Sequence, residues 1–304
     1  MESRADTHVH TKYSGLARIA FLRFPESVSE PRDVVKKAKS IGLNTVCITD
    51  HNTIQGALLA QSFAKNYDGI NVVIGEEIST IDGEVIGLYL NEEVPKGLSA
   101  AETIEIIKAQ GALTVAPHPF SMHVPALGLK VDKLSIDALE VVNAGHVDGY
   151  SNDKAWQHAQ SGKWALAGGS DSHSLNTIGC AYTQFEGSSE EDFRRAILSK
   201  TTKAFGDRMP MNRVIQWSFS VILQSDRLIL KSMLNKNWKV GDNDPVIKKV
   251  RELPTHKKIA ALFGSLAYFT PPVSYLAMIA GERFLKRINS VPIHEVNGKS
   301  TRIL

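Results

Sequence analysis

The 304-residue sequence contains few cysteines and lacks several motifs that would identify its chemistry at once. Its two cysteines, Cys47 and Cys180, belong to no CxxC pair, which argues against a disulfide framework or a zinc ribbon and fits a reducing cytoplasm. The first residues, MESRADTHVH, include no apolar stretch, so no secretory signal is expected. Neither a GxSxG turn nor a P-loop lysine occurs, so a nucleophilic serine or a phosphate loop of those kinds is not predicted.

The composition is otherwise that of an ordinary globular protein, with 43% hydrophobic and 22% charged residues. The charge is distributed unevenly, because residues 1–206 carry a net charge of −6 and residues 207–304 a net charge of +9. This difference predicts two modules, a main domain over 1–206 and a basic, mostly helical extension over 207–304. The basic charge would favour anionic lipid or nucleic acid, or it would simply face solvent.

Two kinds of apolar segment alternate along the first 200 residues. Short β-branched runs predict strands, and longer runs with helical spacing predict helices. The expected strands span 5–10, 43–49, 70–80, 83–90, 112–119, 137–144 and 163–173, and the expected helices span 31–42, 53–67, 99–111, 151–162 and 188–200. Capping boxes are expected at Ser99 with Glu102 and at Ser188 with Glu191. This order predicts an α/β protein with parallel strands flanked by helices.

Polar side chains that can bind metal follow nearly every expected strand. They are His8, His10, Asp50, His51, Glu76, Glu77, His118, Glu140, Asp171 and His173. Half of the ten histidines lie at or just beyond the carboxyl end of an expected strand. In a barrel all these strand ends meet at one face, so a barrel is favoured over an open sheet.

Each cluster also has an ordinary structural explanation. His8 and His10 alternate with Val9 and would share one strand face, while TDHN and GGSDSH would form turns or helix caps. Taken together, the clusters favour a metal centre, because imidazole suits Zn, Mn or Fe and carboxylates can bridge two cations. The donors are too many for one tetrahedral ion, so two or three divalent ions are predicted. Such ions would generate hydroxide from water and neutralise a phosphoryl group.

Six motifs, in order along the chain, resemble those of the PHP superfamily (polymerase and histidinol phosphatase): DTHVHTKYSG, TDHN, GEEIST, APHP, LEVVN and GSDSH. The resemblance covers residues 5 to about 206. It implies a distorted (β/α)7, TIM-like barrel with a centre of two or three metal ions and phosphoesterase activity. The short barrel with GEEIST is most similar to the stand-alone branch that acts on nucleotides or nucleic-acid ends.

The resemblance also implies roles for individual residues. His8 and His10 would hold a first ion with Glu77 and Asp171. Glu77 would bridge to a second ion that His118 also binds, and His51 and His173 would hold a third. The residues expected to act in catalysis are His8, His10, Glu77, His118, Asp171 and His173.

Two positions depart from the pattern of the family. Many relatives carry an aspartate in a stretch SDG where this chain has Gly15, and a histidine at the place of Glu84. Glu84 is expected to bind metal instead, with a preference shifted towards Mn or Mg, so the identity and number of the ions stay open. Asp6 and Asp50 would support the ligands by hydrogen bonds, and Glu140 would either do the same or belong to the core.

Positive charge beside the first motif would suit a phosphorylated substrate. Lys12, Arg18 and Arg23 follow that motif and would either contact phosphate at the mouth of the site or remain solvated.

The extension contains 23 uncharged residues, 259–281, with basic residues on both sides. Pro271 and Pro272 argue against one straight membrane helix, and Thr270 would cap a second helix. The segment 257–288 would therefore form packed helices in the cytosol or a hairpin in contact with anionic headgroups.

The sequence predicts a cytoplasmic, metal-dependent phosphoesterase that hydrolyses a small phosphomonoester, a nucleotide or an oligonucleotide end by metal-activated hydroxide. Two alternatives stay open. One is an amidohydrolase-like metal hydrolase, which also begins with HxH on a barrel, and the other is a non-catalytic module that binds metal. Association with a membrane through 257–288 and the oligomeric state are not decided by the sequence.

Overall fold

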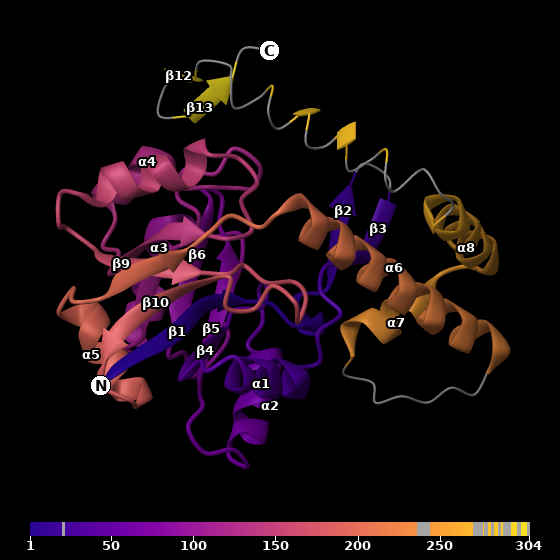
Figure 1. Ribbon diagram of the computed structural model, residues 1–304, viewed down its shortest axis with the longest axis horizontal. Helices are drawn as coiled ribbons and strands as arrows, with labels where there is room; N and C mark the ends of the chain where they lie inside the picture. Colours follow the sequence, from indigo (N-terminus) through magenta and orange to yellow (C-terminus); the bar gives the residue numbers. More distant parts are fainter. Residues whose placement is uncertain are drawn as a thin grey trace.

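The computed structural model describes residues 1–19, 22–235 and 244–269, together with residues 276, 279–280, 283–284, 287, 293–296 and 299–302. Figure 1 shows a central sheet surrounded by helices α1 to α5, with helices α6 to α8 on one side of it.

A nine-stranded sheet forms the centre, in the order β11-β10-β1-β4-β5-β6-β7-β8-β9. Its strands are β1 (Glu2–Val9), β4 (Thr45–Ile48), β5 (Asn71–Ser79), β6 (Glu84–Leu88), β7 (Leu113–Ala116), β8 (Ala138–Asn143), β9 (Ala165–Gly169), β10 (Ala181–Glu186) and β11 (Lys203–Gly206). Two short hairpins lie outside it, β2 (Leu16–Ile19) with β3 (Leu22–Pro25), and β12 (Ile293–Val296) with β13 (Lys299–Arg302).

The expectation of parallel strands holds for only part of the sheet. The pairs β1–β4, β4–β5, β7–β8 and β8–β9 are parallel, but β6 runs antiparallel to both of its neighbours, and β10 is antiparallel to β1 and β11. The reason is the connection from β5 to β6, which comprises only residues 80–83 and closes on Gly83. A parallel crossover needs a dozen residues or more.

The two ends of the sheet approach each other, so that the sheet is a nearly closed, distorted barrel, as the sequence predicted. Hydroxyl groups span the gap between β9 and the strands opposite. Thr7 Oγ1 donates to the carbonyl of Gly168 at 2.9 Å, and Thr183 Oγ1 accepts from the N–H of Gly168 at 2.8 Å. Gly168 is needed here, because a Cβ on it would lie 2.5 Å from the carbonyl oxygen of Tyr182.

Five helices cover the barrel: α1 (Pro31–Ser40), α2 (Gln55–Ala64), α3 (Ala100–Ala109), α4 (Tyr150–Ala159) and α5 (Glu190–Leu198). They match the predicted helices, and their apolar faces pack on the strands, as Val34, Val35 and Ala38 of α1 do against Ile48. Two 3-10 helices, η1 (Lys12–Ser14) and η2 (Gly128–Lys133), lie in connections.

The predicted capping box of α3, Ser99 with Glu102, is confirmed, whereas the box of α5 lies one residue later than predicted. Ser189 is the N-cap, and its partner is Asp192 rather than Glu191. The Asp192 carboxylate accepts from the backbone N–H groups of both Ser188 and Ser189, which fixes this register.

In the part of the extension that the structure describes, α6 (Met211–Leu234), α7 (Pro245–Glu252) and α8 (Thr255–Phe269) precede the hairpin of β12 and β13. The ring of Phe219 of α6 packs at a tilt against those of Tyr268 and Phe269 of α8, with ring centroids 5.5 and 4.9 Å apart. Within the described part of the chain, none of the helices combines the length and the apolar character that a membrane span requires. The expected cap at Thr270 lies outside the described residues.

Candidate metal centre

His8 and His10 begin the site, because β1 brings both imidazoles to the same face of the barrel wall. Their side chains are completely buried, and their ring centroids are 4.9 Å apart. Val9 between them faces the opposite side and joins the hydrophobic core below α1.

Four ligand atoms from three regions of the chain form a first cage. His8 Nε2 and His10 Nε2 are 3.0 Å apart, and each lies 3.3 Å from Glu77 Oε2. Asp171 Oδ1 is 3.6 Å from His8 Nε2 and 3.3 Å from His10 Nε2. Ligands about 2.1 Å from one tetrahedral ion are about 3.4 Å from each other. These five separations are therefore close to the spacing that a divalent cation requires.

The other oxygen of Glu77 faces a second group of ligands. Glu77 Oε1 lies 2.9 Å from His118 Nε2, and Glu84 Oε2 lies 3.8 Å from the same nitrogen. Glu84 Oε1 is also 3.8 Å from His51 Nδ1. Glu77 thus lies between two groups of donors, as a bridging carboxylate must.

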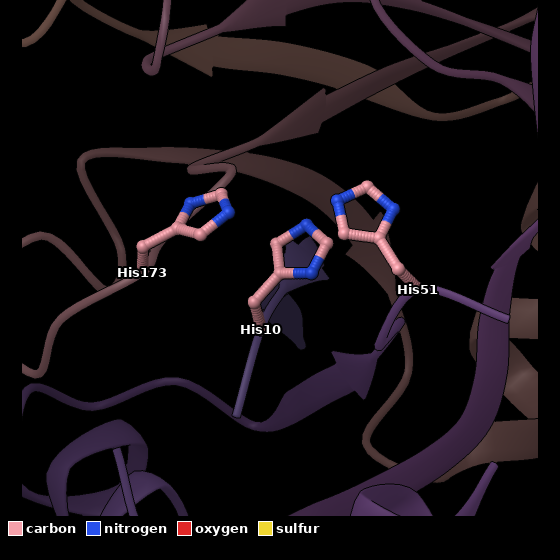
Figure 2. A group of neighbouring side chains, drawn as sticks. All are labelled: His10, His51 and His173. Atoms are coloured by element: carbon pink, nitrogen blue, oxygen red, sulfur yellow. The ribbon is translucent and has the colours of Figure 1, made fainter. Parts of the chain in front are cut away.

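His51 and His173 lie on either side of His10 (Figure 2). The centroid of the His10 ring is 4.7 Å from that of His51 and 4.3 Å from that of His173. One ring nitrogen from each of the three histidines lies within 4.8 Å of the others. All eight residues predicted as metal ligands are therefore gathered at one end of the barrel.

The sequence interpretation missed two residues of this region. Glu26, after strand β3, places Oε1 3.3 Å from His51 Nε2 and 3.6 Å from His173 Nε2. His146 lies beyond β8, and its ring is 6.1 Å from that of His118. Glu26 belongs to no motif, so the sequence held no signal for it. His146 follows a strand end like the other histidines, and that pattern would have found it.

Hydrogen bonds behind the ligands fix their orientation. Glu140 Oε1 accepts from His8 Nδ1 at 3.1 Å, and Glu140 Oε2 accepts from the backbone N–H of His118 at 2.8 Å. The Ser14 hydroxyl lies 2.9 Å from His10 Nδ1 and donates to Asp50 at 2.7 Å. The contact with Glu140 keeps a proton on Nδ1 of His8, so that Nε2 is the nitrogen that would bind a metal ion.

Asp6 supports the backbone rather than a ring. Its carboxylate accepts from the N–H groups of Ser170 at 2.9 Å and of Gly179 at 2.8 Å, and more weakly from that of His8 at 3.4 Å. Asp6 thereby ties β1 to the loop that carries Asp171. Burial raises the pKa of Asp6 to about 6.

Charges in the site shift the pKa values of its members in opposite directions. Burial alone would lower the pKa of His8, but the carboxylates of Asp171, Glu77 and Glu140 outweigh it and raise this pKa well above its usual value. Despite burial, which would raise it, the pKa of Asp171 is held well below its usual range, mainly by His8 and His10. Protons on the imidazoles thus balance the carboxylates, and cations would displace these protons.

Strain and close packing mark the loops that carry the ligands. His118 and Asp171 have positive φ angles of 31° and 49°, which are rare for residues with side chains. Gly169 precedes the Asp171 loop, and a Cβ on it would lie 2.4 Å from Glu140 Oε1 and 2.5 Å from His8 Cβ. Such strain is typical of functional sites.

Some residues in the predicted clusters do not reach the centre. Glu76 lies on the opposite face of β5 from Glu77, where one oxygen accepts from the N–H of Val94 at 2.8 Å. The Lys12 ammonium forms ion pairs with Glu30 and Asp244 rather than facing the site, so neither expectation for it holds. The side chains of Arg18 and Arg23 lie outside the described residues.

Comparisons with known proteins identify relatives of this chain. A model of the PHP-associated family matches residues 149–202. The uncharacterized protein MJ1587 of Methanocaldococcus jannaschii is 53% identical over 152 residues, covering 50% of this chain and 88% of that protein. MJ1588 of the same organism is 31% identical over 119 residues, covering 39% of this chain and 99% of the other.

Two solved structures share the fold. One is a two-domain protein of Bacteroides vulgatus that contains a predicted PHP-like metal-dependent phosphoesterase, with a TM-score of 0.56 and 17% identity over 68% of this chain. The match spans 65% of that protein's length. The other is PsfC from Pseudomonas syringae, with a TM-score of 0.52 and 22% identity, covering 67% of this chain and 91% of PsfC.

The chain thus forms a distorted barrel with histidines and carboxylates at one of its ends, and these groups are able to bind metal ions. This chain belongs to the PHP superfamily, as its motifs predicted.

Proposed function

We propose that the protein is a metal-dependent phosphoesterase whose active centre lies at the end of the barrel that carries His8 and His10. The observation that carries the proposal is the first cage, in which four ligand atoms have the spacing of a tetrahedral ion. If His8 were only a part of the core, it would not need the carboxylates of Glu77 and Asp171 and the further imidazole of His118 so close to it.

The residues present fit two or three divalent ions. His8, His10, Glu77 and Asp171 would hold the first, Glu77, Glu84 and His118 the second, and His51 with His173 the third. The mixture of nitrogen and oxygen donors suits Mn, Zn or Fe, and Glu84 shifts the second position towards Mn. Bound cations would supply a water of lowered pKa and would neutralise charge on a phosphoryl group.

The protein's own groups would prepare this chemistry. Glu140 and Ser14 hold the rings of His8 and His10 in position, so that little reorganisation is needed when the ions bind. Burial of these ligands excludes water from the back of the site, and substrate would approach from the side of His51 and His173, which are the more exposed.

The substrate class follows from the chemistry of the site. A phosphate ester is favoured, whether it is a small phosphomonoester, a nucleotide or an oligonucleotide end. The amidohydrolase-like and the non-catalytic alternatives have no separate observation in their favour, and the activity assay below separates them.

Hydrolysis of aryl phosphate mono- and diesters, nucleotides and 5′-labelled oligonucleotides in added Mn tests this function, with an amide panel in parallel. We expect phosphate-ester turnover that chelator abolishes, and its loss in His8→Ala and Asp171→Ala. Glu76→Gln, a change of a buried carboxylate on the other face of β5, should keep full activity. Turnover that survives in either alanine variant would refute the assignment.

We also propose that the barrel, 1–206, and the extension, 207–304, act as two modules, and that 257–288 contacts a membrane surface. On α8 the exposed side chains of Ile259, Phe263 and Leu266 follow one another at helical spacing, which supports a contact of that kind. Cosedimentation with anionic and neutral vesicles measures it, and absence of binding to both would contradict it.

A further inference from the structure

Glu26 occupies a position in which it can replace a carboxylate that the first motif lacks. The resemblance to the PHP superfamily implies an aspartate at the place where this chain has Gly15. In the hairpin formed by β2 and β3, Leu16 pairs with Pro25, and the N–H of Glu26 donates to the carbonyl of Gly15 at 3.1 Å. Glu26 therefore lies directly across the hairpin from the missing acid.

The carboxylate of Glu26 points at two imidazoles. Its Oε1 lies 3.3 Å from His51 Nε2 and 3.6 Å from His173 Nε2, which is close to the spacing of about 3.4 Å between ligands of one ion. The other nitrogens of both rings are engaged elsewhere. His51 Nδ1 lies 3.2 Å from Glu77 Oε2, and His173 Nδ1 donates to the carbonyl of Asp171 at 2.9 Å. Both Nε2 atoms are thus turned towards Glu26.

The helical extension holds Glu26 in this place. Trp217 of α6 donates its indole N–H to the carbonyl of Glu26 at 3.2 Å, and the Trp217 ring lies edge-on to His173 with centroids 6.1 Å apart. Residues 191 positions apart in the sequence therefore meet at the edge of the site. A hairpin alone would leave the carboxylate less well oriented.

We propose that Glu26 binds a third divalent cation together with His51 and His173, and that α6 positions it through Trp217. This inference rests on the proposed metal-dependent function. The side chains of the three ligands are 20–23% exposed, whereas those of His8 and His10 are completely buried. Three protein ligands leave a tetrahedral ion one open position. The third cation is therefore the one that a substrate phosphate can reach directly.

Metal stoichiometry tests the proposal. Wild type, Glu26→Gln and a matched control at the exposed Glu92, Glu92→Gln, are loaded with Mn or Zn, desalted and measured by elemental analysis. We expect three ions per chain in wild type and in the control, and two in Glu26→Gln, with third-ion affinity at least about 100-fold weaker, since even partners behind a ligand contribute 10–100-fold. Thermal melting in chelator shows whether each variant folds.

Trp217→Phe provides a second variant, because it keeps an aromatic ring beside His173 while it removes the N–H donor together with one ring of the indole. We expect the third-ion affinity to fall by about 10-fold and the first two ions to remain. Three ions in Glu26→Gln with unchanged affinity, or two ions in both wild type and variant, would overturn the role of Glu26 and leave the phosphoesterase proposal intact. Absence of any bound ion in wild type would overturn the proposed function as well.

Discussion

Replacement of Glu140 by glutamine changes a hydrogen-bond partner of the ligands in the first cage and leaves the ligands themselves unchanged. Glu140 Oε2 accepts from two N–H groups, the backbone of His118 and the side chain of Asn143, both at 2.8 Å. Glutamine must keep its oxygen there, because an NH2 group would face two donors. Its NH2 group then faces Nδ1 of His8, which must accept a hydrogen bond and move its proton to Nε2. In that tautomer His8 cannot bind metal.

The expected cost follows from this loss of the correct tautomer. Changes to the hydrogen-bond partners of metal ligands typically lower affinity by about 10–100-fold, or about 1.4–2.7 kcal/mol. Titration against a fluorescent chelator measures the affinity of the tightest ion in the wild type and in Glu140→Gln. Nitrogen-15 NMR of His8 in the metal-free protein, recorded at a pH at which the imidazole is neutral, reports the tautomer independently of binding.

Glu76→Gln provides the matched control, because Glu76 is a buried glutamate on β5, in the same sheet, that accepts a hydrogen bond from a backbone N–H but faces away from the site. It should leave metal affinity unchanged. If Glu140→Gln folds, shows Nε2 of His8 protonated and still binds metal as tightly as wild type, His8 is not a ligand through Nε2. The first cage would then be misassigned.

Three further outcomes are expected. Glu84→His should shift metal preference from Mn towards Zn, since imidazole is the softer ligand. Competition dialysis against both ions would show the shift. An unchanged preference would mean that Glu84 does not bind the second ion. In chelator, the free energy of unfolding should fall by up to about 3 kcal/mol between pH 6.5 and 9. Against the effect of burial, mainly Glu77 raises the pKa of His51 from 6.5 to about 9, so the folded chain keeps a proton that the unfolded chain loses. Urea titrations at several pH values test this, and a rise in the free energy of unfolding over that range would contradict it. Ser189→Ala should cost about 1 kcal/mol of stability through loss of the α5 cap, and an equal loss in Ser188→Ala would disprove the register.

The sequence predicted most of the site because its ligands follow strand ends. His8 lies near the end of β1, His10 follows directly after this strand, and His118 follows β7, so the barrel alone brings their side chains together. The cluster GEEIS was ambiguous, since adjacent residues of a strand face opposite sides. The resemblance to the PHP superfamily assigned the ligand role to Glu77, and in the structure Glu77, not Glu76, faces the cage.

Other features could not be predicted because they depend on contacts between distant segments. Glu26 reaches the site through the pairing of a hairpin and the contact of Trp217 with its carbonyl, and neither leaves a local pattern. The direction of β6 is set by a short turn that closes on Gly83, while its apolar sequence fits either orientation. Lys12 carries the charge of a phosphate ligand, yet its ion pair with Asp244 of the extension places it elsewhere.

The central claim is that His8, His10, Glu77 and Asp171 together hold a divalent cation. Anomalous diffraction from crystals grown with Mn or Zn tests it most directly. The account predicts an anomalous peak about 2 Å from Nε2 of both His8 and His10, within the four-atom cage. A map at saturating metal with no peak in this cage, or with peaks only elsewhere on the protein, would contradict it.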